Sequence, residues 1–112
     1  VERRAMDVLQ FDTNRVGGIT QAMKVAALAE AFGLSVVPHA GQMHNYHVVM
    51  ASPAAPMAEY FPPVPVEVGN ELFWEIFEGD PVPERGSIDL PETPGLGLRL
   101  REDLPGRFRM HG

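Results

Sequence analysis

The sequence predicts an α/β fold built on a parallel sheet. Over the first 61 residues, three short apolar segments alternate with a long and a short helical segment. This alternation predicts parallel strands joined by crossover helices. Three strands with helices on one side leave a sheet face uncovered, and parallel sheets normally have both faces covered. The chain also starts at Val1, in what looks like the end of a helix. We therefore expect a fragment of a larger α/β protein.

The first predicted strand and helix lie before Gly33. Residues 7–11 (DVLQF) predict a short buried strand, and a turn-rich TNRVGG follows soon after it. Residues 20–32 (TQAMKVAALAEAF) are dominated by residues that favour helices. Thr20 is suited to be the N-cap, and Gly33 is suited to the left-handed position just beyond the helix.

Two further strands are predicted before the composition changes. Residues 34–38 (LSVVP) are rich in β-branched side chains and predict the second strand. Residues 45–51 predict one or two helical turns. Pro53 and Pro56 then break the chain, and residues 57–61 (MAEYF) predict a third short strand.

The remainder is rich in proline. Of the eleven prolines in the chain, most lie beyond residue 60. We expect an extended loop over 62–69 and a short helix over 70–77 (NELFWEIF), packed on the body or at an oligomer contact. Short strands are expected at 86–91 and 95–100, followed by a surface tail from 101 to 112.

Composition excludes several classes of function. The net charge of −6 argues against a nucleic-acid partner, because phosphate binding needs clustered Lys and Arg. The absence of cysteine excludes disulfides, thiolate catalysis and Cys-ligated zinc. No apolar stretch approaches the roughly 18 residues of a membrane span, and no signal peptide is visible. We therefore expect a soluble cytoplasmic protein without a membrane or nucleic-acid partner.

Three polar side chains follow the predicted strands. Asp12 and His39 come directly after the first two, and Glu59 sits near the third. In parallel α/β folds, active sites are built at this edge. A carboxylate beside a histidine supports acid–base chemistry near neutral pH. Singly, each residue has an ordinary explanation as a turn cap, a loop residue or a solvent-facing carboxylate, but the three together favour a catalytic site.

The clustered histidines permit a second interpretation. His39, His44 and His47 fall within nine residues, and the last two could share a helix face. Imidazoles bind zinc, but this spacing matches no strong zinc signature. We therefore expect His44 and His47 to line or support a substrate pocket, and His111 to lie in the tail.

Several spaced motifs resemble one enzyme family. The stretch DTNRVGGITQAMKVAALAEAFGLSVVPH, followed by HNYH and PMAEYF, resembles the C-terminal half of the enolase superfamily, and more narrowly its mandelate racemase subgroup. With the later DPVPERGSI and PGLGLRL, the pattern is most similar to acid sugar dehydratases of the L-rhamnonate dehydratase kind.

The resemblance implies a fold and a division of the chain. Residues 1–61 would hold the last three β/α units of a (β/α)8 TIM barrel. Residues 62–112 would be an extension packing on the barrel and the capping domain. That N-terminal capping domain and the first barrel strands would be absent.

The resemblance also implies roles for the site residues. Asp12 and His39 would form a His–Asp dyad, with His39 as the general acid or base. Glu59 would contact the substrate carboxylate. The three Mg²⁺-binding carboxylates and the base on the opposite face would precede Val1, so no metal ligand is expected in this chain. The 112 residues alone would then be inactive.

The implied enzyme is a hydro-lyase of carbohydrate catabolism, acting on an acid sugar and commonly a homo-oligomer. A racemase, epimerase or cycloisomerase of the same superfamily is the first alternative. A non-catalytic α/β module, or one that binds a metal through its histidines, is the alternative of another class. Only this last alternative predicts that the chain folds stably by itself.

Overall fold

The computed structural model describes residue 3 and residues 5–40, 42–62 and 71–104, with the backbone alone described at 71 and 72. The chain divides into two compact units, Val1–Phe61 and Pro62–Gly112. Each unit is described by itself below.

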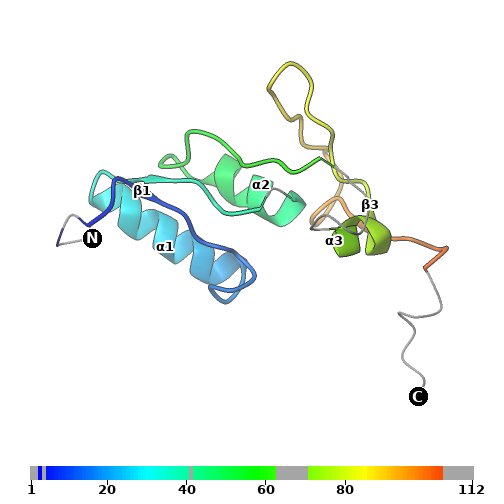
Figure 1. Cartoon of the computed structure of the whole chain (residues 1–112), viewed down its shortest axis with the longest axis horizontal. Helices are drawn as coiled ribbons and strands as arrows, with labels where there is room; N and C mark the ends of the chain where they lie inside the picture. The colour runs from blue at the N-terminus through cyan, green and yellow to red at the C-terminus, as the bar shows by residue number, and fades with distance from the viewer. Residues whose placement is uncertain (1–2, 4, 41, 63–70, 105–112) are drawn as a thin grey trace. The chain divides into compact units, whose positions relative to one another are not determined.

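The first unit is built on a β–α–β crossover. Strand β1 (Val8–Leu9) pairs in parallel with β2 (Ser35–Val36), and helix α1 (Ile19–Ala31) connects them. Figure 1 shows α1 running alongside the strands. Backbone bonds continue the pairing beyond the strands, from Val37 N–H to the Leu9 carbonyl (3.0 Å) and from His39 N–H to the Phe11 carbonyl (2.7 Å). The predicted parallel arrangement of the first two strands is confirmed.

Glycines mark both ends of α1. Gly18, with φ of 89°, is the N-cap and provides no side-chain cap, and Gly33, with φ of 67°, follows the C-terminal turn. The prediction for Gly33 is confirmed, because only a left-handed residue lets the chain reverse there. The prediction that Thr20 is the N-cap is wrong. The helix begins one residue earlier, at Ile19, because the chain already turns at Gly18.

Small side chains form the contact between α1 and β2. Ala22, Ala26 and Ala29 are buried along one face of α1, and Val36 of β2 is fully buried against the last two. Alanine brings the helix close to the strands because no long side chain separates them. Leu9, Phe11 and Leu34 pack around this cluster and remain partly buried.

Helix α2 (Met43–Ala51) follows β2 and begins two residues before the predicted 45–51. The predicted strand at 57–61 is wrong, since these residues are in neither strand nor helix. One backbone bond ties the stretch before them to β2, from Val36 N–H to the Ala54 carbonyl (2.9 Å). Pro53 and Pro56 lack the N–H groups with which a ladder would begin.

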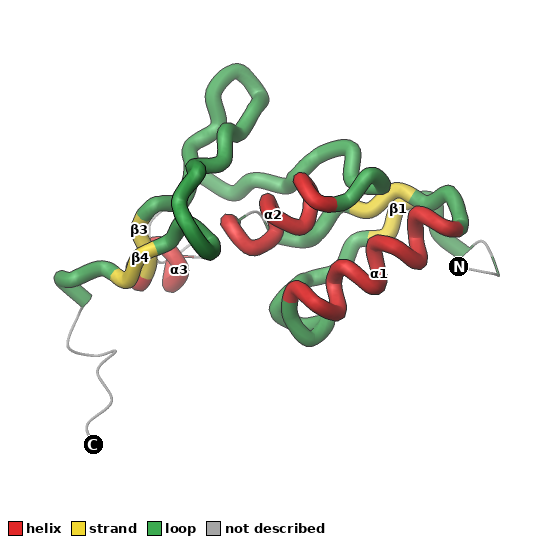
Figure 2. Tube along the Cα trace, turned by 180° about the vertical axis from the view of Figure 1, so that it is seen from behind, coloured by secondary structure: helices red, strands yellow, loops and turns green. Residues whose placement is uncertain are grey.

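The second unit contains a short helix and a pair of short antiparallel strands. Helix α3 (Glu71–Ile76) lies within the helix expected at 70–77, and it leads into β3 (Phe77–Glu78). Strand β4 (Arg99–Leu100) pairs with β3 in antiparallel fashion, as Figure 2 shows from behind. Thus the strand expected at 95–100 exists only over its last two residues.

The strand expected at 86–91 is wrong. This region contains one isolated bridge, between Glu84 and Ser87. The chain near β4 instead lies against Gly79, where a Cβ atom would fall 2.7 Å from the Gly97 carbonyl oxygen. Only glycine permits that approach.

Two predictions lie outside the described residues. They are the loop over 62–69, of which only residue 62 is described, and the position of His111 in the tail. Within the described part, no helix is long and apolar enough to cross a membrane.

Candidate active site

The clearest feature of the site is the contact between His39 and Glu59. The Nδ1 atom of His39 lies 3.1 Å from Oε2 of Glu59, and the two side chains are 51% and 30% exposed. The same carboxylate oxygen accepts a hydrogen bond from the backbone N–H of Ala40. The ring of Phe61 meets the imidazole edge-on, with centroids 6.1 Å apart. The structure therefore brings together two of the three predicted catalytic residues.

Asp12 has different partners. One carboxylate oxygen accepts hydrogen bonds from the N–H groups of Asn14 (2.8 Å) and Arg15 (3.3 Å), and the other lies 3.4 Å from Arg15 Nε. Aspartate side chains commonly accept hydrogen bonds from backbone N–H groups a few residues further on and fix a turn in this way. Among the described residues, no hydrogen bond or ion pair joins Asp12 to His39. The implied role of Asp12 beside His39 stays a prediction.

Asp12 instead acts electrostatically on His44 of α2. Burial lowers the pKa of His44 from its ordinary value, and the Asp12 carboxylate offsets part of that shift. An imidazole that resists protonation is a neutral hydrogen-bonding group at physiological pH. His47, one turn later, has a buried Nε2 atom that meets no hydrogen-bond partner in the described part of the chain. Both residues remain candidates for a pocket lining.

Sequence reasoning missed two buried polar residues, Thr13 and Asn45. The Thr13 hydroxyl donates to Oδ1 of Asn45. The amide group of Asn45 donates to the carbonyl oxygens of His39 (2.8 Å) and Ala40. Their positions in the sequence were a weak indication of a role near the site, since Thr13 follows Asp12 and Asn45 lies between His44 and His47. Polarity alone does not distinguish such residues from solvent-facing ones.

The described residues do not supply a metal centre. No group of three or more His, Asp or Glu side chains in the described ranges could hold a metal ion. The alternative of a histidine metal site at His39, His44 and His47 therefore gains no support there. Mg²⁺ prefers an octahedral set of oxygen ligands, and the donors that the structure describes do not fit it.

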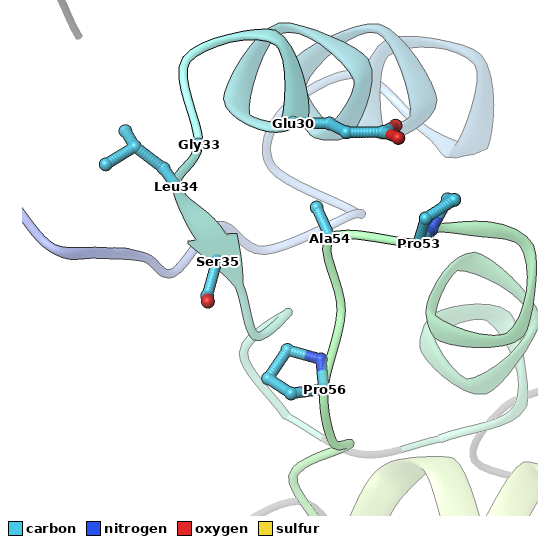
Figure 3. A pocket seen from close by; sticks show the side chains of 7 residues that line it. All are labelled: Glu30, Gly33, Leu34, Ser35, Pro53, Ala54 and Pro56. Carbon is cyan, nitrogen blue, oxygen red and sulfur yellow. The ribbon is translucent and has the colours of Figure 1, made fainter.

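An open cavity of about 260 Å³ lies at the other end of β2. Figure 3 shows its lining, drawn from the last turn of α1, the start of β2 and the chain after α2. The residues are Glu30, Gly33, Leu34, Ser35, Pro53, Ala54 and Pro56. Because β2 runs from Ser35 toward His39, this cavity lies at the opposite end of the strand from the candidate site.

Comparison with known proteins identifies the family. Residues 1–104 match the family model described as enolase C-terminal domain-like. An L-rhamnonate dehydratase from Saccharopolyspora erythraea is 40% identical over 100 residues, which are 88% of this chain and 25% of that enzyme. The chain thus spans about a quarter of the length of this relative.

Solved structures agree. L-Talarate dehydratase from Polaromonas sp. JS666, complexed with Mg and L-glucarate, superposes with a TM-score of 0.76 at 35% identity over 92% of this chain and 26% of that one. L-Rhamnonate dehydratase from Gibberella zeae gives 0.74 at 32% identity, over 91% and 27%. The resemblance read from the spaced motifs is confirmed: the chain belongs to the enolase superfamily, as an enolase C-terminal domain-like segment of the mandelate racemase subgroup.

Proposed function

We propose that this chain is about a quarter of a Mg²⁺-dependent acid sugar dehydratase. Residues 1–61 would supply the last three β/α units of its barrel, and residues 62–112 would return to the capping domain. The observation that carries the proposal is the 40% identity to an L-rhamnonate dehydratase. The fit to a talarate dehydratase that holds L-glucarate supports an acid sugar as the substrate class.

The proposed reaction is a dehydration next to a carboxylate. A base removes the proton from the carbon α to the carboxylate, which leaves an enolate. The C–O bond at the β carbon then breaks, and the hydroxyl leaves as water after it receives a proton. The resulting enol becomes a ketone, so the product is a 2-keto-3-deoxy acid and one water molecule.

His39 is the proposed acid that protonates the departing hydroxyl. Its position after β2 supports this role, because active sites of parallel α/β barrels form at the carboxyl ends of the strands. The contact of Nδ1 with Glu59 leaves Nε2 as the nitrogen that can face a substrate. A carboxylate at Nδ1 fixes the tautomer and stabilises the charged ring.

Glu59 and Asp12 complete the proposed set. Glu59 would act on the substrate carboxylate, as the resemblance implies, or on His39, which it contacts in this structure. In the first role the Glu59 carboxyl would have to carry a proton and donate to the developing oxyanion, where one good donor lowers a barrier by about 3–4 kcal/mol. Asp12 would approach His39 only if its bonds to the following turn were exchanged for new ones.

The base and the metal would come from outside these residues. The resemblance implies Mg²⁺ and an opposite-face base on earlier strands, and the described side chains do not form a metal site. The metal would supply charge stabilisation at the substrate carboxylate. Each role proposed here for this chain concerns only proton transfer and orientation by its own side chains.

The test uses the complete polypeptide that carries this segment, supplied with Mg²⁺. A library of acid sugars is screened for 2-keto-3-deoxy products, and the same mixtures in deuterium oxide are analysed by mass spectrometry for exchange at the α carbon. We expect one sugar acid to give the keto product. Exchange or epimerisation without that product would assign the racemase or epimerase alternative. If neither dehydration nor exchange is observed, the proposal of enzymatic activity on acid sugars is overturned.

A further inference from the structure

We propose that Thr13 and Asn45 are positioning residues that hold His39 at the end of β2. The inference rests on the proposed function, since it assigns a role in that chemistry. Neither side chain reaches the reacting atoms in this account. They act through the backbone of the loop that carries the imidazole.

Because the Thr13–Asn45 pair is buried, the loss of its hydrogen bonds would be costly in free energy. Thr13 and Asn45 are 1% and 2% exposed, and they are joined directly to each other. A buried polar group that loses its partner is costly, because water cannot replace the lost bond. The pair therefore connects the loop after β1 to helix α2 in one arrangement.

The bonds of Asn45 determine how its amide is oriented. Carbonyl oxygens only accept hydrogen bonds, so the NH₂ group must face the carbonyls of His39 and Ala40. The oxygen then faces the Thr13 hydroxyl, which donates to it. Both amide hydrogens and the amide oxygen are used, and a flipped amide would lose both bonds to the carbonyls, because its oxygen would then face two acceptors.

The loop is held from two sides. Asn45 binds the carbonyls of His39 and Ala40, while Glu59 binds the N–H of Ala40 and the imidazole. Ala40 has φ of 60°, a conformation that a non-glycine residue rarely keeps without such constraints. Without the Thr13 hydroxyl, the buried Oδ1 of Asn45 would lose its donor, and the amide that anchors the peptide after His39 would be held less firmly.

The experiment removes the Thr13 hydroxyl in the complete polypeptide. Thr13→Val has nearly the same shape, Thr13→Ser keeps the hydroxyl, and Ser52→Ala removes another buried hydroxyl at the far end of α2. For Thr13→Val we expect kcat for the sugar acid to fall by about 10- to 100-fold, as for a slightly misplaced catalytic group. KM should stay within about twofold, because binding contacts are unchanged.

The serine variant separates positioning from packing. Thr13→Ser should recover most of the lost kcat, and Ser52→Ala should retain the wild-type value. If folded Thr13→Val keeps wild-type kcat, or if Thr13→Ser is as slow as Thr13→Val, the proposal is overturned. If Thr13→Val does not accumulate as folded protein, Thr13→Ala takes its place, and the same loss and rescue are required.

A second readout does not need activity. Hydrogen exchange measured by NMR should accelerate at the amides of His39 and Ala40 in Thr13→Val, while the amides of α1 keep their wild-type rates. Equal acceleration in α1 would mean general destabilisation and would contradict positioning. If the wild type turns over no sugar acid, the proposed function fails, and this readout still decides whether Thr13 and Asn45 hold the loop.

Discussion

The two described regions differ in how far their side chains are removed from water. Every buried residue of the described chain lies between Thr13 and Ser52, in the first unit. Between residues 73 and 104, each described side chain is half-buried or exposed. The first unit therefore has a core of its own, and its polar residues are fixed by packing. Among the described residues of the second unit none is buried, so this unit lacks such a core.

The same contrast applies to the two sides of the first unit. One side of the β1–β2 pair is covered by α1, whose alanines pack against Val36. Val8, whose side chain alternates with that of Leu9 along β1, is 53% exposed. A parallel pair with one uncovered face is expected to need further structure. This supports the proposal that the chain is part of a barrel.

The largest expected effect concerns association. We expect the isolated 112-residue chain to self-associate, so that its mass in sedimentation is well above the 12.3 kDa of the monomer. The uncovered strands and the apolar face are surfaces on which chains can pair. Val8→Lys should reduce the association, and Leu100→Lys, at a site 62% exposed in the second unit, should have less effect. Analytical ultracentrifugation measures both. A monomeric, cooperatively folding wild-type chain would favour the free-standing module instead.

Substitution of one glutamate in each region compares the importance of their ion pairs for activity. Glu59 contacts His39, whereas Glu78 makes an exposed pair with Arg99. In the complete polypeptide, Glu59→Gln should lower kcat about 100-fold, because the charged acceptor that supports His39 in acid–base catalysis is lost. Glu78→Gln should change kcat less than twofold, since exposed pairs contribute little. Steady-state kinetics with the identified sugar acid measure both variants. Equal kcat values for Glu59→Gln and Glu78→Gln would contradict a catalytic role for the contact of Glu59 with His39.

Substitution of one valine in each region compares how much side-chain packing there contributes to stability. Val36 is fully buried and Val82 is 71% exposed. Val36→Ala should lower the free energy of unfolding of the complete polypeptide by about 2 kcal/mol, from lost burial and the cavity left behind. Val82→Ala should change it by less than about 0.5 kcal/mol. Urea unfolding of both variants is the measurement. A large loss at Val82 would show that the complete protein buries this site.

The smallest effect is the pH dependence from His44. Its pKa is lowered by burial, so the folded state resists a proton that the unfolded chain accepts below its pKa of about 6.5. Stability should therefore fall as pH drops through this range and be unaffected above it. In His44→Gln, the free energy of unfolding should change less between pH 7.5 and 5.5 than in the wild type. Identical changes in both proteins would contradict this account of His44.

The sequence predicted the elements that local patterns determine. The alanine-rich stretch, Gly33 and the β-branched segment at 34–38 were sufficient for α1 and β2. Placing polar residues after the strands predicted the neighbourhood of His39 and Glu59. The expected strand at 57–61 failed because a strand requires a partner. Apolar composition does not supply one.

The remaining differences depend on long-range contacts. Thr13 and Asn45 are 32 residues apart, and no local pattern pairs them. Asp12 could bind its own turn or reach His39, and the choice depends on geometry that residue types do not contain. In the second unit, β4 pairs with the chain after α3 across more than 20 residues. Composition suggested strands there but could not say which would pair.

The most direct test of the central claim is the turnover of the identified sugar acid by His39→Asn in the complete polypeptide. His111→Asn, a histidine to which no role is assigned, is the matched control. We predict that His39→Asn loses at least about 1,000-fold in kcat, in the range of a lost acid–base group, while the control keeps the wild-type rate. Full activity of folded His39→Asn would contradict the site proposed here.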